Sequence, residues 1–388
     1  MNYIVISPYY PENFQQFTIE LANKGIRVLG IGQEPYEQLG PGLQNALTEY
    51  FRVDNLENLD EVKRAVAFLF YKHGPIDRIE SHNEYWLEQD AQLREQFNVF
   101  GAKPNDLKKT KFKSEMKKLF QKAGVPVVPG QVVKKLSDVD QAVKKIGLPL
   151  IAKPDNGVGA AATFKIETAA DVEHFKAEWD QETVYFFEKF VTSSEICTFD
   201  GLIDSEGNIV FSTTFDYAYT PLDLMLYKMD NSYYILKEMD PKLRAYGEAI
   251  VQAFGMKERF FHIEFFRQDG DYIAIEYNNR PAGGFTIDVY NYAHSIDLYR
   301  GYANIVVGEP FPESDVEPLF CLATSRRASS HYAYSEADLL EKYRDNFKVK
   351  EDMPAAFAEL QGDYLYMLTT PSREQMEEMI ADFGKKAE

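Results

Sequence analysis

Apolar residues near the N-terminus alternate between short strand-like runs and helical repeats. Phe14, Phe17 and Leu21 recur at the spacing of one helix face. The pattern predicts strands over 3–7, 27–32 and 76–81, and helices over 13–23, 59–71 and 84–97. Strands and helices in alternation indicate a parallel sheet covered by helices. Residues 7–11, after the first strand, contain no G-x-G-x-x-G sequence, so we expect no dinucleotide site there.

The rest of the chain mixes strands and helices in a less regular order. A lysine-rich stretch over 103–122 carries Phe112, Met116 and Phe120 on one face, which predicts a single helix that ends at Gly124. Further strands are expected over 131–134, 148–153, 184–190, 196–202 and 209–215, and helices over 138–146 and 241–254. A hairpin over 260–278, two helices over 285–307 and a final group of strands and helices follow. We therefore expect a mixed α/β protein without internal repeats.

The strands expected over 260–267 and 272–278 flank Asp269 and Gly270, which predicts a hairpin. A two-residue turn would put Glu264 and Glu276 on opposite faces, whereas a turn centred on a left-handed Gly270 puts them directly across from each other. The second register collects one apolar face, made of Phe261, Ile263, Phe265, Ile273, Ile275 and Tyr277. His262, Glu264, Glu276 and Asn278 then share the other face. We expect the second register because it separates apolar from polar side chains.

The polar face of this hairpin is a candidate metal site. Glu264, Glu276 and Asn278 would gather on one surface, and grouped carboxylates are costly unless a cation compensates them. Oxygen ligands of this kind suit Mg²⁺; the alternative is a solvated polar face with incidental acids. Arg280 follows on the same face if the strand continues, where a guanidinium can clamp a phosphate or a carboxylate. Residues 281–284 then lead into a helix whose N-terminus can bind an anion.

The charge balance limits the partners of the chain. Its 388 residues include 42 Lys and Arg against 61 Asp and Glu, a formal net charge of −19 at pH 7. Such a surface repels polyanions, so we expect neither nucleic acid nor a membrane as partner, while a local basic pocket remains allowed. Cys197 and Cys321 match neither a disulfide framework nor a metal cluster. No signal peptide and no apolar run of ~18 residues is evident, so we expect a cytoplasmic protein.

Several motifs, in order and in spacing, resemble those of the ATP-grasp superfamily and of its carboxylate–amine ligase branch, which includes amino-acid and D-alanine ligases. Glu276-Tyr-Asn278-Asn-Arg280, preceded by Glu264, resembles the E-x-N-x-R signature of that family. The other matching elements are Lys113 ahead of Gly124-Val-Pro, Lys153 in a P-x-x-x-K-P context, the small-residue loop 155–163, the hinge Glu188-Lys-Phe190-Val191 and the acid Glu195. The loop departs from the family pattern because Ala160, Ala161 and Ala162 replace hydroxyl-bearing residues.

The resemblance implies a fold. We expect a Rossmann-like lobe over 1–105, a small lid lobe over 106–190, a large lobe with the metal site over 191–310, and a C-terminal α/β segment over 311–388 that completes the large lobe. It also implies an ATP-dependent ligase that activates a carboxylate as an acyl phosphate, which an amine or a thiol captures, with release of ADP and phosphate. The expected partners are ATP, two Mg²⁺ or Mn²⁺ ions, and a small carboxylate and amine; a homodimer is suggested.

Site roles carry over residue by residue. Arg280 is expected to stabilise the transferring phosphoryl group. The residues expected to bind ATP are Lys113, Lys153, Gly157, Gly159, Glu188, Phe190, Val191 and Glu195; those expected to hold metal are Glu264, Glu276 and Asn278; those expected to contact substrate are Gly283, Gly284 and Arg326. Arg326 and Arg327 are neighbours, so at most one can reach the site. His262 is expected to be a structural histidine with a satisfied ring.

Two other functions stay open. One is a carboxylase-like enzyme that activates bicarbonate with the same nucleotide apparatus. The other is a non-catalytic ATP-binding regulatory protein on the same fold. The acids and the arginine of the E-x-N-x-R signature favour an active enzyme, because decayed members would be expected to lose them; the alanine-rich loop points the other way.

Overall fold

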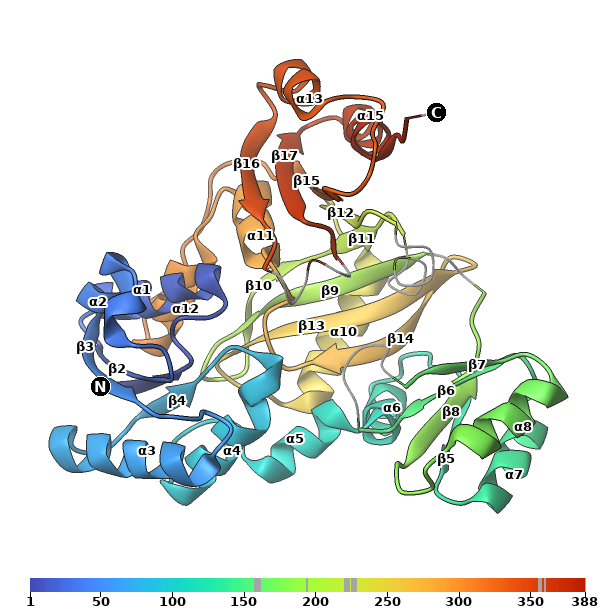
Figure 1. Ribbon diagram of the computed structural model, residues 1–388, viewed down its shortest axis with the longest axis horizontal. Coiled ribbons are helices and arrows are strands. Elements are labelled where there is room, and N and C mark those ends of the chain that lie inside the picture. The colour runs from blue at the N-terminus through green and yellow to red at the C-terminus, as the bar shows by residue number, and fades with distance from the viewer. Residues whose placement is uncertain are drawn as a thin grey trace.

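The computed structural model describes residues 1–156, 162–192, 195–219, 224, 229–354, 358 and 361–387. Three sheets organise the chain (Figure 1): a four-stranded N-terminal sheet, a four-stranded sheet in the small lobe and a nine-stranded sheet in the large lobe. The mixed α/β fold with a parallel N-terminal sheet is thus as expected. Among the described residues, no helix is both long enough and apolar enough to cross a membrane.

The N-terminal lobe is a parallel sheet covered on both faces, as parallel sheets require. Its strands are β1 (Asn2–Ile6), β2 (Arg27–Gly32), β3 (Leu47–Arg52) and β4 (Arg78–Glu80), in the order β3-β2-β1-β4. Its helices are α1 (Gln15–Asn23), α2 (Pro41–Ala46), α3 (Leu59–His73) and α4 (Leu87–Gln96), with short 3-10 turns η1 (Glu12–Phe14), η2 (Tyr36–Gln38) and η3 (Glu84–Trp86). Tyr3 and Val5 of β1 pack toward α1, and Ile4 and Ile6 pack toward α3.

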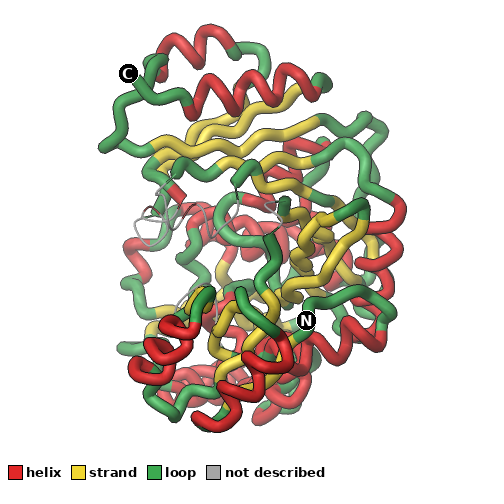
Figure 2. Tube along the Cα trace, turned by 90° about the vertical axis from the view of Figure 1, so that its right-hand side faces the viewer, coloured by secondary structure: helices red, strands yellow, loops and turns green. Residues whose placement is uncertain are grey.

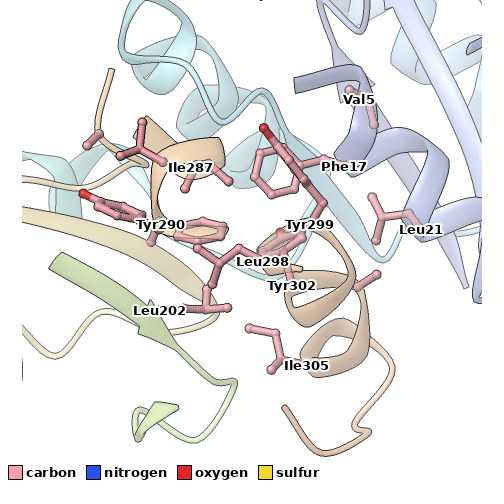
Figure 3. Packing of buried hydrophobic residues seen from close by; sticks show 14 of the residues in the cluster. Val5, Phe17, Leu21, Leu202, Ile287, Tyr290, Leu298, Tyr299, Tyr302 and Ile305 are labelled. Atoms are coloured by element: carbon pink, nitrogen blue, oxygen red, sulfur yellow. The ribbon is translucent and has the colours of Figure 1, made fainter. Parts of the chain in front are cut away.

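Helix α1 fixes this lobe to the large lobe. Figure 3 shows Phe17 beside Tyr299 and Tyr302 of α12 (Leu298–Val306), with ring centroids 4.7 Å and 5.5 Å apart. A buried ion pair supports the contact, because Glu80 at the end of β4 accepts hydrogen bonds from Arg259 of the large lobe at 2.9 Å and from Arg94 at 2.8 Å. The two lobes therefore share one continuous core.

The lysine-rich stretch forms two helices, α5 (Pro104–Lys111) and α6 (Lys113–Lys122), so the expected single helix over 103–122 is wrong. Phe112 interrupts the helix in an extended conformation and pairs with Asn156 in an isolated bridge. The backbone N–H of Lys113 donates to the carbonyl of Asp155 at 2.9 Å, and Ser114 donates twice to the Asp155 carboxylate, at 2.8 Å and 2.7 Å. These contacts cap α6 and fix its first residue, Lys113, beside residues 155–156.

Helix α6 packs into the core of the large lobe, although the expected boundaries assign it to the small lobe. Its Met116 and Phe120 belong to the same buried cluster as Phe261 and Ile263 of the hairpin. The helix therefore connects the two lobes by contacting both.

The small lobe is a four-stranded antiparallel sheet with two helices on one face (Figure 1). Its strands are β5 (Gly130–Val133), β6 (Leu150–Pro154), β7 (Phe164–Ile166) and β8 (Tyr185–Lys189), in the order β5-β8-β6-β7, and its helices are α7 (Leu136–Ile146) and α8 (Ala169–Glu178). Leu150, Ala152, Phe175 and Phe187 form the core between sheet and helices. The opposite face of the sheet is left to the polar side chains of the site.

The nine-stranded sheet of the large lobe runs through to the C-terminal segment. Its strands are β9 (Ile196–Ile203), β10 (Ile209–Thr213), β11 (Phe215–Tyr217), β12 (Ser232–Ile235), β13 (Arg259–Gln268), β14 (Asp271–Asn278), β15 (Phe320–Arg326), β16 (Phe347–Asp352) and β17 (Tyr364–Thr370). The helices are α10 (Pro241–Phe254), α11 (Thr286–His294), α12, α13 (Glu336–Lys342) and α15 (Arg373–Gly384). Figure 2 shows the C-terminal helices outside the last strands. The strand expected over 209–215 is divided at Thr214 into β10 and β11.

The β13–β14 hairpin pairs Glu264 directly with Glu276, as expected, but the turn and the register that produce this pairing differ from the expected ones. Its turn is the two-residue one, with Asp269 at φ +51° and Gly270 at φ +75°, so the expected turn centred on Gly270 is wrong. A β-bulge at Ile275 takes up the odd residue and restores the pairing of the two acids. Beyond the bulge, Tyr272 and Ala274 face the core in place of Ile273 and Ile275.

Candidate active site

Two carboxylates face the small lobe from adjacent strands. Glu264 and Glu276 are direct neighbours across β13 and β14, and their side chains are 18% and 22% exposed. Glu276 forms an ion pair with Lys113, Oε1 to Nζ 3.4 Å. Glu264 accepts a hydrogen bond from the hydroxyl of Tyr217 at 3.1 Å. Among the described residues, no hydrogen bond engages Oε2 of either acid, so the donor set fits a hard cation such as Mg²⁺.

His262 lies next to Glu264, and both of its ring nitrogens have polar partners, as expected of a structural histidine. Its Nδ1 lies 2.6 Å from Asp200, which also accepts from the hydroxyl of Tyr290 at 2.9 Å, and its Nε2 lies 3.6 Å from Glu264 Oε1. Burial would lower the pKa of His262, but the Asp200 carboxylate outweighs it and raises the pKa to about 9. Burial would likewise raise the pKa of Glu264, yet hydrogen bonds from His262 and Tyr217 lower it. Glu264 is therefore held ionised, as a metal ligand must be.

A buried cluster of two lysines and one acid, contributed by the small lobe and by α6, lies near these carboxylates. Glu188 of β8 lies between Lys153 of β6, with which it forms an ion pair, and Lys117 of α6, whose Nζ is 3.0 Å from Oε2. Although burial alone would raise the pKa of Glu188, the two lysines lower it to about 2. Burial opposes the charge of Lys153, but Glu188 and the hairpin acids raise its pKa. Sequence reasoning assigned no role to Lys117, the second counterion of Glu188.

Replacing Glu188 by glutamine is expected to destabilise the fold by about 3 kcal/mol at neutral pH, because two buried ammonium groups lose their counterion. The pKa of Glu188 is lowered from 4.5 to about 2 in the folded protein. Its ionised form therefore stabilises the fold above pH 4.5, and this contribution disappears as the pH falls toward 2. The difference in Tm between wild type and Glu188→Gln should narrow over that range. Glu182→Gln, at an exposed position of the same lobe, is the control. A Tm difference between wild type and Glu188→Gln that does not change with pH would contradict this account.

Arg280 is held by an acid from the N-terminal lobe. Its Nε donates to Glu84 Oε2 at 2.7 Å and its Nη1 donates to the Pro281 carbonyl at 2.8 Å. Glu84 lies in η3, far away in the sequence, so no local motif identified it. Asn278, at the end of β14, is paired with His262 and completes the polar end of the hairpin.

The segment after Arg280 links the site to the N-terminal lobe. Gly284 adopts φ +64°, a left-handed conformation that favours glycine, and its carbonyl accepts from Asn13 Nδ2 at 3.2 Å. The carbonyl of Gly283 accepts from the Thr286 hydroxyl at 2.6 Å, in the first turn of α11. A cavity of about 670 Å³ borders Gly284 and Asn13. The two glycines therefore lie at an open junction between the lobes.

Phe190, Val191 and Glu195, three further expected nucleotide contacts, lie between the end of β8 and the start of β9. The N–H of Phe190 donates to the Pro149 carbonyl at 3.2 Å, which ties Phe190 to the small sheet just beyond β8, and Val191 follows it. Glu195 is paired through its backbone and its carboxylate with Arg267, and its side chain is 65% exposed. Gly157 and Gly159 lie outside the described residues. The nucleotide roles of these residues stay predictions.

Arg326 does not join the hairpin acids. It shares the face of β15 with Leu322, which packs toward α13 and α15, and its guanidinium contacts Tyr332 and Tyr334 of the C-terminal segment. Arg327 instead donates to the carbonyl oxygens of Met229 and Ala358. Strand alternation allows only one of the pair near the site, and Arg326, the one expected to contact substrate, lies on the face of β15 that packs toward α13 and α15.

Comparison with known proteins supports this picture. Residues 144–288 match the model of the ATP-grasp domain family. The chain is 25% identical over 332 residues to an L-arginine-specific L-amino acid ligase from Bacillus subtilis, covering 81% of this chain and 77% of that protein.

Solved structures share the fold over nearly the whole chain. An L-amino acid ligase from Bacillus licheniformis has a TM-score of 0.72 at 14% identity, covering 98% of this chain and 97% of that one. The biotin carboxylase domain of the 2-oxoglutarate carboxylase from Hydrogenobacter thermophilus has a TM-score of 0.73 at 15% identity, covering 98% and 89%. The matched domain contains Lys153, the hairpin acids and Arg280. Residues 144–288 are therefore similar to the ATP-grasp domain family, and the whole chain shares the fold of the enzymes named above.

Proposed function

We propose that the chain is an ATP-dependent ligase that joins a carboxylate to an amine through an acyl phosphate. The observation that carries the proposal is the meeting of two facing acids, Glu264 and Glu276, with the lysines Lys113 and Lys153 at the junction of the small and large lobes. ATP carries about four negative charges, so its phosphates need cationic side chains, while acids on the opposite side hold the cation that the phosphates share.

The proposed nucleotide contacts follow from this arrangement. Lys113 and Lys153 bind the phosphates, and Gly157 and Gly159, which lie outside the described residues, are proposed to bind them as well. Glu188 holds Lys153 and the neighbouring Lys117 in position, while Phe190, Val191 and Glu195 contact the adenosine. Glu264, Glu276 and Asn278 hold Mg²⁺, with two ions proposed. Such an ion neutralises phosphate charge and polarises the γ-phosphoryl group.

The reaction then needs no protein nucleophile. An oxygen of the substrate carboxylate attacks the γ-phosphorus, the bond to the β-phosphate oxygen breaks, and ADP leaves. The amine attacks the carbonyl carbon of the acyl phosphate, loses a proton, and releases phosphate as the amide forms. Arg280 stabilises the negative charge on the transferring phosphoryl group. The lobes exclude water, which would otherwise hydrolyse the acyl phosphate.

Amino acids are the proposed substrates. The relatives are named as L-amino acid ligases, one of them specific for L-arginine, and the cavity beside Gly284 and Asn13 offers room for a small substrate. A bicarbonate-activating carboxylase is the second candidate, because the biotin carboxylase domain superposes on 98% of the chain.

The test is ATP turnover with Mg²⁺ against pools of amino acids, small carboxylates and bicarbonate, with ADP, phosphate and the joined product measured. Phosphate release that requires two amino acids and yields a dipeptide supports the proposal. Release that requires bicarbonate supports the carboxylase. Binding of Mg-ATP without turnover in any pool would favour a regulatory protein.

A further inference from the structure

A second polar cavity lies between the end of β15 and the C-terminal residues, away from the hairpin acids. Its volume is about 610 Å³, and it is lined by Arg326, Ser330, His331, Tyr334 and Ser335, together with Tyr332, Glu336 and Ala387. Arg326 reaches it from the face of β15 that packs toward α13 and α15. None of the groups assigned above to the nucleotide or the metal lines this cavity.

Arg326 lines the cavity, and its hydrogen bonding is incomplete for a buried arginine. The residue is 5% exposed, and its guanidinium lies 3.7 Å from the centroid of the Tyr332 ring. Its Nη2 donates to the Tyr334 carbonyl at 2.8 Å, but its Nε finds no hydrogen-bond partner among the residues that the structure describes. A buried guanidinium without a paired acid is costly, so a ligand that supplies acceptors would relieve the cost.

The acid that lines the cavity does not neutralise Arg326 by direct contact. The carboxylate of Glu336 is engaged by Lys350 Nζ at 3.0 Å and by the Tyr366 hydroxyl at 2.9 Å. Lys386 lies over the Tyr332 ring at 3.9 Å and adds positive charge beside the cavity, partly offset by its ion pair with Asp230. This local excess of cations stands out in a chain whose net charge is −19.

The remaining lining groups suit an acceptor-rich ligand. The hydroxyls of Ser330 and Ser335 and the imidazole of His331 are small polar groups that can donate hydrogen bonds. The Tyr332 ring holds the guanidinium of Arg326 in one orientation. Arg326 therefore loses less conformational entropy on binding an anion than a freely moving arginine would. A planar guanidinium matches the geometry of carboxylate and phosphate oxygens.

We propose that this cavity is an oxyanion-binding site, which takes the carboxylate or phosphate group of a small metabolite with Arg326 as its main donor. The site is separate from the nucleotide site and does not depend on the proposed ligase activity. A ligand of either chemistry would complete the hydrogen bonding of Arg326 and join β15 to the C-terminal segment.

The test is an NMR titration that follows the imidazole ring resonances of His331, one of six histidines in the chain. The His331 resonances are assigned as those that disappear in His331→Gln. Inorganic phosphate and succinate are titrated separately at constant pH and ionic strength. A saturable shift of His331 with phosphate supports a phosphate site, and one with succinate supports a carboxylate site. If neither anion moves the resonance, the proposal is overturned, whatever the activity of the enzyme.

Variants localise the effect to the guanidinium. Arg326→Gln should raise the Kd for the anion that binds by about tenfold, which is the usual contribution of one charge-assisted hydrogen bond. Arg344→Gln is the matched control, because it removes the same charge from an exposed position nearby. Arg326→Lys, which keeps the charge but loses the planar fork, should give an intermediate affinity and serves if the glutamine variant does not fold. A titration of both Arg326 variants that matches wild type would contradict the proposal.

Discussion

Replacing Glu276 by glutamine is expected to slow ATP-dependent phosphate release by about a thousandfold at saturating Mg-ATP. The amide keeps the shape of the side chain but removes the negative charge that faces Glu264 across the hairpin and pairs with Lys113 at 3.4 Å. Without that charge the proposed cation is held by fewer anionic oxygens. The measurement is kcat with the accepted substrates over a range of Mg²⁺ concentrations, where the variant should need more Mg²⁺ than wild type.

The control for Glu276 is Glu313→Gln, which removes one negative charge at an exposed position. Both variants should keep the far-UV circular dichroism and the cooperative melting of wild type. If Glu276→Gln released phosphate at the rate of Glu313→Gln with the same dependence on Mg²⁺, the cation would have to bind elsewhere.

Arg280→Lys is expected to lower kcat by about a hundredfold while leaving the affinity for Mg-ATP nearly unchanged. Lysine keeps the positive charge but not the planar fork that would contact two oxygens of the transferring phosphoryl group. The proposed contact is strongest in the transition state, so its loss should affect kcat more than KM. Single-turnover measurement of ADP formation separates this step from product release.

Glu84 provides a second variant for the same argument. Its carboxylate holds Arg280 Nε at 2.7 Å, so Glu84→Gln should loosen the guanidinium and cause a smaller loss of kcat than Arg280→Lys. Arg373→Lys, at an exposed position on α15, should behave like wild type. If Arg280→Lys and Arg373→Lys turned over ATP at the same rate, the proposed role of Arg280 in phosphoryl transfer would be wrong.

Local patterns in the sequence were sufficient for most of the fold. The helices over 13–23 and 59–71 and the strand over 27–32 were predicted within a few residues, because buried apolar residues repeat at the period of each element. The hairpin illustrates the limit. An odd number of residues separates Glu264 from Glu276, so opposed acids require either an odd turn or a bulge, and the apolar pattern cannot distinguish the two. The structure has the bulge, at Ile275.

Long-range contacts explain what the sequence did not reveal about the site. Lys113 and Lys153 were identified through motif spacing, but Glu84, Lys117 and Asp200 act on residues that are distant in the chain. Only the folded chain brings each of them to its partner. The break at Phe112 has the same origin, since its bridge to Asn156 competes with continuation of the helix.

The double attachment of α6 has a consequence for motion between the lobes. Met116 and Phe120 anchor the helix in the large lobe, whereas Lys113 and Ser114 at its start are hydrogen-bonded to Asp155 of the small lobe. If the lobes move relative to each other, the first turn of α6 would therefore act as the pivot. Rotation about it would change the distance from β6 to the hairpin while Lys113 stays near Glu276. A nucleotide bound as proposed would then meet one half of its phosphate site already assembled, and only the other half would need to close on it.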